Sequence, residues 1–313
     1  MRRRHDVKTK KLRAVAVAAL ALLPLAGCAD NAAQASSSAV GDKKIEQPFS
    51  IFLGDAIGVV DYAQLKVLNQ CLADKGYPQN LRVMASGPRN PFPQLIVTEA
   101  TFGPASEDDA KRRGFGQDEP ATPPAVVSSD PTYDRVSDQC AEDAWKKLSP
   151  NAKEVYYSYF DLGNALGMPF LLTVNQRMGQ ARWDQLLSCL AGKGYQTTKK
   201  ADFYRYPDPG LFGVPLGSDT PDPAASWVPK HVPGTVEVGP AVPARSYTPA
   251  PREADFALAW YRCRRDTGID KEQMATVMQV EGELVKKNET ALSELNPQVE
   301  QVAKQAAALI GQS

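Results

Sequence analysis

Histidine is nearly absent from this chain, since only His5 and His231 occur among its 313 residues. So few imidazoles disfavour histidine-based zinc sites and the usual nucleophile–histidine triads. The chain also lacks Gly-x-Ser-x-Gly, Ser-x-x-Lys, His-Glu-x-x-His, a phosphate-cradling glycine loop and a dinucleotide fingerprint. We therefore expect no cofactor and no metal site, and we expect His231, in a Pro-rich loop, to be a surface residue.

Long apolar runs are also missing. The apolar stretch Ala14–Leu25 is only about a dozen residues long, whereas a membrane-spanning helix needs roughly 20. It follows a basic region and precedes small residues, which predicts a secretory signal peptide over residues 1–27. Leu25-Ala26-Gly27-Cys28 resembles the bacterial lipobox. That resemblance implies that Cys28 receives a diacylglycerol and becomes the new N-terminus; the alternative is a plain secretory signal that contains a cysteine.

The arginines of the basic region leave the export route open. Arg2–Arg4 suggest a twin-arginine signal, but His5, Asp6 and Lys8 stand where apolar residues are expected. Residues 28–46 are rich in Ala, Ser, Asp and Lys without apolar periodicity, which predicts a flexible tether. Two acyl chains anchor a protein stably without a transmembrane helix.

Excess positive charge is absent once the signal peptide is removed. The 36 basic and 36 acidic residues fall to 29 and 35, a net charge near −6. Nucleic-acid binding depends largely on basic residues that displace counterions from phosphate, so we expect no nucleic-acid partner.

Beyond Cys28 the chain has four cysteines: Cys71, Cys140, Cys189 and Cys263. Residues 71–77 (CLADKGY) and 189–195 (CLAGKGY) agree at six of seven positions, which indicates a tandem duplication. Each repeat continues into a Pro-rich stretch and reaches a second cysteine, with Tyr133 or Phe256 seven positions before it. We infer disulfides Cys71–Cys140 and Cys189–Cys263. Free thiols or a four-cysteine zinc site are the alternatives, although no Cys-x-x-Cys pair supports zinc.

Glycines after the cysteines predict where helices end. Gly76, Gly194 and Gly268 each follow a cysteine by five residues and suit the left-handed position after a helix, so we assign them to helix capping. Cys140 has no such glycine, and its helix is expected to run on to Ser149-Pro150. The alternative, that Lys-Gly-Tyr is a ligand-binding turn, is not needed to explain these residue types. Apolar stripes predict the helices themselves, at the positions Tyr62, Leu65, Leu68 and Leu72 and again at Trp183, Leu186, Leu187 and Leu190.

The expected fold is mainly α, with two tandem helical modules each closed by a disulfide and carrying a long Pro-rich loop. After the signal and tether, the predicted parts are a first disulfide module (47–150), a connecting helical segment (151–180), a second disulfide module (181–268) and a C-terminal helical pair (269–313). Asn296-Pro297 predicts the break within that pair, and we expect a hairpin packed on the second module rather than a coiled-coil arm.

The Pro-rich loops, residues 78–131 and 196–252, are the hardest parts to interpret. Gln94–Thr98 and Thr235–Val238 are β-prone and could pair as edge hairpins. The second loop is unusually aromatic, and we expect its rings to pack onto the helices rather than to form a recognition surface; they are Tyr204, Tyr206, Phe212, Trp227 and Tyr247.

The lipobox, the tether and the repeated Cys-x-x-x-Lys-Gly-Tyr with a distal cysteine resemble uncharacterised actinobacterial surface lipoproteins. The resemblance implies a location, the outer face of the cytoplasmic membrane, and no activity. We expect a noncatalytic binding or accessory protein whose partner is an envelope protein complex or a cell-wall component. The alternatives are a glycan hydrolase using carboxylates, with Asp108-Asp109 and Asp118-Glu119 as the acidic candidates, and an immunity lipoprotein that sequesters an antimicrobial peptide. A two-lobed solute-binding protein is a weaker option, because strand–helix alternation is missing.

Overall fold

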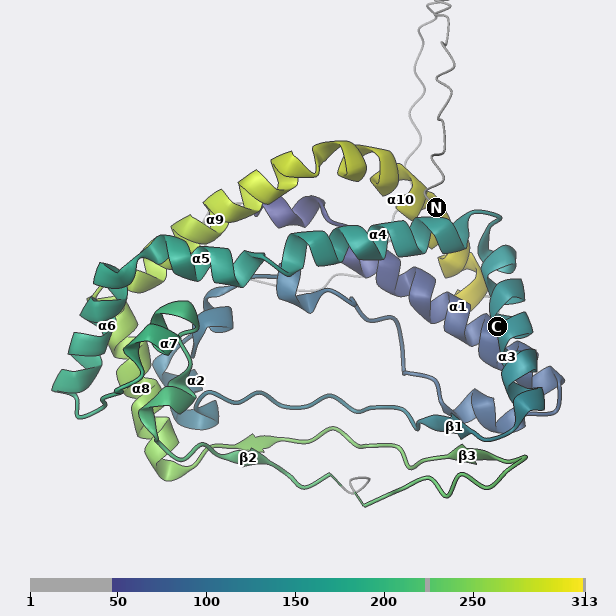
Figure 1. Cartoon of the computed structure of the whole chain (residues 1–313), viewed down its shortest axis with the longest axis horizontal. Helices are drawn as coiled ribbons and strands as arrows, with labels where there is room; N and C mark the ends of the chain where they lie inside the picture. The colour runs from purple at the N-terminus through teal and green to yellow at the C-terminus, as the bar shows by residue number, and fades with distance from the viewer. Residues whose placement is uncertain (1–46, 223–225, 312–313) are drawn as a thin grey trace, which may run out of the picture. The chain divides into compact units, whose positions relative to one another are not determined.

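A computed structural model describes residues 47–222 and 226–311, which belong to one compact unit, Ile45–Ser313. The signal peptide, the tether and Cys28 lie outside the described residues. The unit is mainly helical (Figure 1), as predicted. Its helices are α1 (Gly54–Asp74), α2 (Glu107–Arg113), α3 (Pro131–Leu148), α4 (Ala152–Gly167), α5 (Phe170–Met178), α6 (Gln180–Gly192), α7 (Lys200–Arg205), α8 (Pro251–Asp266), α9 (Ile269–Lys287) and α10 (Glu289–Gly311). Short 3-10 helices lie at Pro48–Ile51, Pro78–Arg82, Pro93–Leu95, Glu99–Phe102 and Pro209–Phe212, and the strands are β1 (Val126–Ser128), β2 (Ser218–Asp219), β3 (Val236–Val238) and β4 (Tyr247–Thr248).

Two disulfides brace the helices. Cys71–Cys140 joins α1 to α3 and Cys189–Cys263 joins α6 to α8, each with Cα atoms 5.7 Å apart. The predicted pairing is confirmed, and the zinc and free-thiol alternatives are wrong for these four cysteines. Each bridge closes a loop of about 70 residues, a closure for which the chain-entropy model assigns roughly 4 kcal/mol.

α1 and α6 end in the same hydrogen-bonded turn. Tyr77 donates its backbone N–H to the Leu72 carbonyl at 2.9 Å, and Tyr195 donates to Leu190 at 3.0 Å. Gly76 and Gly194 between them have φ of +100° and +90°. A Cβ at either glycine would meet nothing within 4 Å, so the left-handed backbone, rather than lack of space, favours glycine.

Each turn also aims its tyrosine at the second half of its module. The Tyr77 ring packs edge-on against Tyr133 with centroids 4.8 Å apart, and the Tyr195 ring lies 4.6 Å from Phe256. Tyr133 and Phe256 are the aromatics seven positions before the second cysteines. The two modules therefore share a helix, a disulfide, a capping turn and an aromatic pair.

The first helix begins earlier than its apolar stripe suggested. α1 starts at Gly54, and its buried positions include Ile57 and Val60, whereas Leu65 is exposed. The predicted stripe is therefore wrong at Leu65, although α1 packs against α3, α4 and α10. The apolar residues ahead of the helix, Phe49 and Phe52, join this main core.

The C-terminal helices correct a second expectation. They do not form a hairpin on the second module, because α10 lies along α1 and α4 of the first. Pro297 is inside α10, and the break between the helices falls at Asn288. The helix continues through the proline because its buried stripe, Leu292, Val299, Val302 and Ala306, extends across both sides of it.

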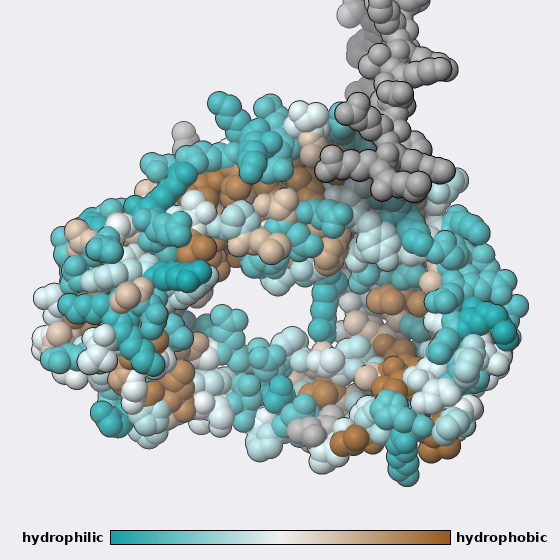
Figure 2. Space-filling view, in the orientation of Figure 1, coloured by the Kyte–Doolittle hydropathy of each residue, from teal (hydrophilic) through white to brown (hydrophobic). Residues whose placement is uncertain are grey.

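The two Pro-rich loops pair with each other, and the second loop also pairs with itself where β2 meets β4. β1 of the first loop is antiparallel to β3 of the second, and Glu119↔Arg245 and Thr122↔Val242 extend the pairing. Gln94–Thr98 is not a strand, because Pro93 opens a 3-10 turn there. Figure 2 shows that side chains leave an opening on this face of the unit, between the helices and the paired loops. The paired loops thus connect the two modules in addition to the connecting helical segment.

The first loop also crosses to the second module, where its α2 packs on α8. The second core beneath it contains Trp183, Phe203, Phe256 and Trp260. Part of the first module therefore completes the packing of the second, and this crossing forms the site described next.

Candidate ligand-binding site

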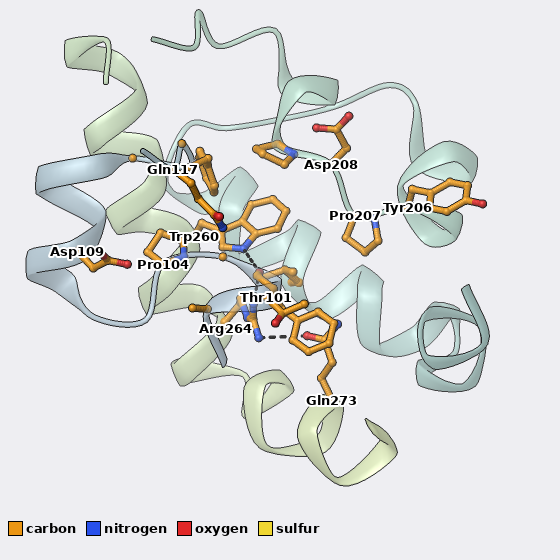
Figure 3. Close-up of a pocket in the computed structure, with 18 of the residues that line it drawn as sticks. Thr101, Pro104, Asp109, Gln117, Tyr206, Pro207, Asp208, Trp260, Arg264 and Gln273 are labelled. Atoms are coloured by element: carbon orange, nitrogen blue, oxygen red, sulfur yellow. Dashed lines mark hydrogen bonds between the residues drawn. The ribbon is translucent and has the colours of Figure 1, made fainter. Parts of the chain in front are cut away.

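A cavity of about 360 Å³ lies where the first loop meets the second module (Figure 3). Residues 100–117 of the first loop form one wall, and residues 206–209 of the second loop form another. α5, α6, α8 and α9 complete it through Leu171, Asn175, Trp183, Leu186, Trp260, Arg264 and Gln273. A hollow of about 460 Å³ beside α6 is lined by exposed polar side chains such as Asp184 and Lys200 and has no buried polar residue.

Two buried indoles give the cavity a fixed apolar side. Trp183 donates Nε1–H to the Asn175 carbonyl at 3.1 Å, and Trp260 donates Nε1–H to the Phe102 carbonyl at 3.4 Å. Phe115 meets the Trp260 ring edge-on, with centroids 5.5 Å apart. Because each indole is both packed and hydrogen-bonded, a ligand would meet a surface that needs little reorganisation.

Arg264 brings a positive charge to the same cavity. Its side chain is only 6% exposed, donating from Nη2 to Gln273 Oε1 at 3.1 Å and from Nη1 to the Phe102 carbonyl. Burial lowers the pKa of Arg264 to about 10, and the charges of Asp270 and Glu99 act in the opposite direction. The guanidinium is therefore still protonated at neutral pH. Figure 3 shows it beside Thr101, with the Gln273 hydrogen bond dashed.

Asp109 and Arg113 form an ion pair at the α2 wall. Arg113 Nε donates to Asp109 Oδ1 at 2.7 Å, and the Ala105 N–H donates to Asp109 Oδ2 at 3.2 Å. The hydrogen bond from Arg113 is the main cause of a lowered pKa at Asp109, with the Ala105 N–H and the charge of Arg113 adding to it. Asp109 is consequently held as a carboxylate. Within the described residues, Arg113 uses no Nη atom in a hydrogen bond.

Glu253 fastens the first loop to α8 behind the cavity. Its carboxylate is fully buried and accepts the Phe115 N–H at 2.8 Å, the Ala250 N–H at 3.2 Å, the Gly217 N–H and the Tyr247 hydroxyl. Three segments of the chain, at Phe115, at Gly217 and at residues 247–250, thus converge on one side chain.

Gly114 makes the approach of the loop to Glu253 possible. Its φ is +58°, and a Cβ there would lie 2.4 Å from Glu253 Oε1. The loop can approach the carboxylate this closely only at a residue without a side chain.

The residues singled out from the sequence occupy different places. Gly76, Gly194 and Gly268 end helices and do not line the cavity, whereas Cys263 is buried in the core that includes Trp260. His231 is exposed. Asp109 lines the cavity, whereas Asp108, Asp118 and Glu119 are exposed.

The aromatics of the second loop divide. Phe212 and Tyr204 pack on the second core as expected, and Tyr247 bonds to Glu253. Tyr206 is 51% exposed and lines the cavity. Packing therefore accounts for most of these rings, and Tyr206 alone of the three tyrosines faces the candidate site.

The sequence-based reasoning missed Arg264, Gln273 and Glu253. Only Glu253 had a local signal, since Pro251 and Glu253 at the first and third helical positions are typical of a capped helix start. Across residues 47–222 and 226–311, no three His, Cys, Asp or Glu side chains are placed to hold a metal ion. No helix in these ranges is both long and apolar enough to span a bilayer.

Comparisons of the chain with protein families, curated proteins and solved structures find no match. The structure itself defines a mainly helical protein with two disulfide-braced modules and a cavity where a loop of one meets the core of the other.

Proposed function

We propose that this protein is an envelope lipoprotein, anchored through Cys28 to the outer face of the cytoplasmic membrane, that binds a ligand or partner without catalysing a reaction. The two disulfides support a location outside the cytoplasm, because such bridges persist in oxidising compartments and are rare in reducing ones. The lipobox-like Leu25–Cys28 and the tether after it supply the anchor.

The cavity is the observation that carries the binding role. Its indoles are fixed by hydrogen bonds and its charged groups are already held in place, features typical of a preformed ligand site. A carboxylate-dependent hydrolase would need a general acid that stays protonated near neutral pH. The lowered pKa of Asp109 is the opposite of that requirement, so we favour binding over hydrolysis.

Crosslinking in intact cells tests the proposal. Wild-type protein and a Cys28→Ser variant would be crosslinked and their captured partners identified, after fractionation of membranes from soluble material. We expect the wild type in the membrane fraction with a reproducible envelope complex or cell-wall component, and the variant without it. A Cys28→Ser protein that is processed at the same bond and remains in the membrane fraction would contradict the anchor, and turnover of cell-wall fragments by the purified protein would contradict the noncatalytic role.

A further inference from the structure

The charge of Arg264 is the least compensated feature of the cavity. Its two hydrogen bonds go to neutral oxygens, those of Phe102 and Gln273, and the nearby carboxylate of Asp270 is bound by Arg265 at 3.0 Å. A guanidinium has five N–H donors, so three are not used by these bonds. A buried charge without a directly bonded counter-ion is costly, and an anion in the cavity would relieve that cost.

The second guanidinium on the lining, that of Arg113, is balanced by its own ion pair. Arg113 lines the cavity and spends only Nε on Asp109. The other carboxylate on the lining, Asp208, is exposed and accepts the Gly210 N–H at 2.8 Å. Within the described residues, Arg264 is thus the buried charge on the lining that has no ion-pair partner, which disfavours a cationic ligand.

The rest of the lining selects for an apolar body. Trp183, Trp260 and Phe115 are packed rings, Leu171 and Leu186 add aliphatic surface, and the volume is near the lower end of the usual range for ligand sites, about 300–1,000 Å³. Rings of this kind bind flat apolar groups through face or edge contacts.

We propose that this cavity binds a small, mainly apolar molecule carrying a single carboxylate, with the carboxylate on Arg264 and the apolar body against Trp260. The planar fork of arginine matches a carboxylate in a bidentate geometry, which lysine cannot reproduce. This inference rests on the proposed binding function and adds the ligand class to it.

Calorimetric titration of the folded, disulfide-bonded protein tests the ligand class. The probes are benzoate, 2-naphthoate and indole-3-acetate, each beside its neutral carboxamide, and 2-naphthylmethylamine as a cation. We expect at least one carboxylate to bind about tenfold or more tightly than its amide, because the amide leaves Arg264 without a counter-ion, and we expect the amine not to bind. No binding by any carboxylate at millimolar concentration, or equal binding of acid and amide, overturns the assignment.

Variants locate the binding. Leu171→Trp places a large ring at a partly exposed lining position and breaks no hydrogen bond, so it should weaken carboxylate binding about tenfold or more by filling the cavity. Leu65→Trp, at a similarly exposed position of α1 that does not line the cavity, is the matched control and should bind as the wild type does. Carboxylate binding that survives in Leu171→Trp places the site elsewhere and overturns the proposal.

Arg264→Gln tests the charge itself. The variant should lose the preference for acid over amide while amide binding persists, and Arg113→Gln should reduce the preference about threefold. If Arg264→Gln fails to fold, Arg113→Gln and Leu171→Trp still decide the matter. A chain that is not membrane-anchored but still prefers carboxylates would overturn the proposed location alone, whereas an anchored chain without that preference would overturn the ligand class alone.

Discussion

Glu281 makes the stability of this protein dependent on pH in an unusual direction. The carboxyl group is fully buried on α9; Oε2 accepts the Phe49 N–H at a long 3.4 Å, and Oε1 has no hydrogen-bond partner within the described residues. Burial raises the pKa of Glu281 to about 7 from its ordinary value of 4.5, and the Phe49 N–H only partly opposes that rise. Folding therefore favours the protonated acid.

The sign follows from comparing the folded and unfolded chains. Below about pH 4.5 both are protonated at Glu281, and the side chain adds no pH dependence. Between pH 4.5 and about 7 the unfolded chain ionises while the folded one does not, so the free energy of unfolding falls as pH rises. At 1.36 kcal/mol per pKa unit, the loss amounts to about 3 kcal/mol above pH 8.

The substitution Glu281→Gln removes the ionisation and nearly keeps the shape. Urea unfolding of wild type and variant at pH 4, 6 and 8, with disulfides intact, should show the variant gaining about 3 kcal/mol relative to the wild type across this range. Glu283→Gln is the control on the same helix, because Glu283 is exposed and pairs with Arg177, which lowers its pKa. If the difference in free energy of unfolding between wild type and Glu281→Gln stays constant from pH 4 to pH 8, the reasoning is refuted.

Three further substitutions probe the fold. Glu253→Gln should reduce the free energy of unfolding by roughly 3 kcal/mol, since an amide nitrogen would face backbone N–H donors; urea unfolding with far-UV circular dichroism measures it, and a loss below about 0.5 kcal/mol would contradict the role of Glu253. Gly194→Ala should reduce the free energy of unfolding by about 1 kcal/mol because Gly194 has a positive φ, whereas Gly192→Ala, two residues earlier in α6, should not reduce it. Equal thermal midpoints for these two variants would argue against the capping account. Replacing Cys71 and Cys140 together by serine should cost about 4 kcal/mol, and an unchanged urea midpoint would show that the bridge constrains little.

The sequence predicted what short-range rules decide. The cysteine pairing could be predicted from a repeated heptapeptide. The turn at Gly76 could be predicted because its left-handed backbone conformation depends on only a few neighbouring residues. The connecting helical segment was predicted over residues 151–180, and α4 (Ala152–Gly167) and α5 (Phe170–Met178) lie within it.

The errors come from contacts distant in sequence. Asn296-Pro297 is typical of a helix start, yet packing of α10 on α1 keeps that helix continuous. Arg264 lies in the run Arg262-Cys263-Arg264-Arg265, which on composition suggests a solvated helix face. It is buried because Phe102, 162 residues away, covers it, and nothing near Arg264 in the sequence encodes that contact. The cavity was unpredictable for the same reason, since its walls come from two loops and four helices.

The disulfides also have an order that suits synthesis from the N-terminus. Cys71 pairs with the next of these four cysteines, Cys140, and Cys189 pairs with Cys263, so the bridges are neither nested nor crossed. If the proposed export takes the general secretory route, on which the chain crosses unfolded, Cys71 and Cys140 leave the channel before Cys189 emerges. Oxidation in order of arrival therefore yields the native bridges directly, without the slow reshuffling that nested bridges require.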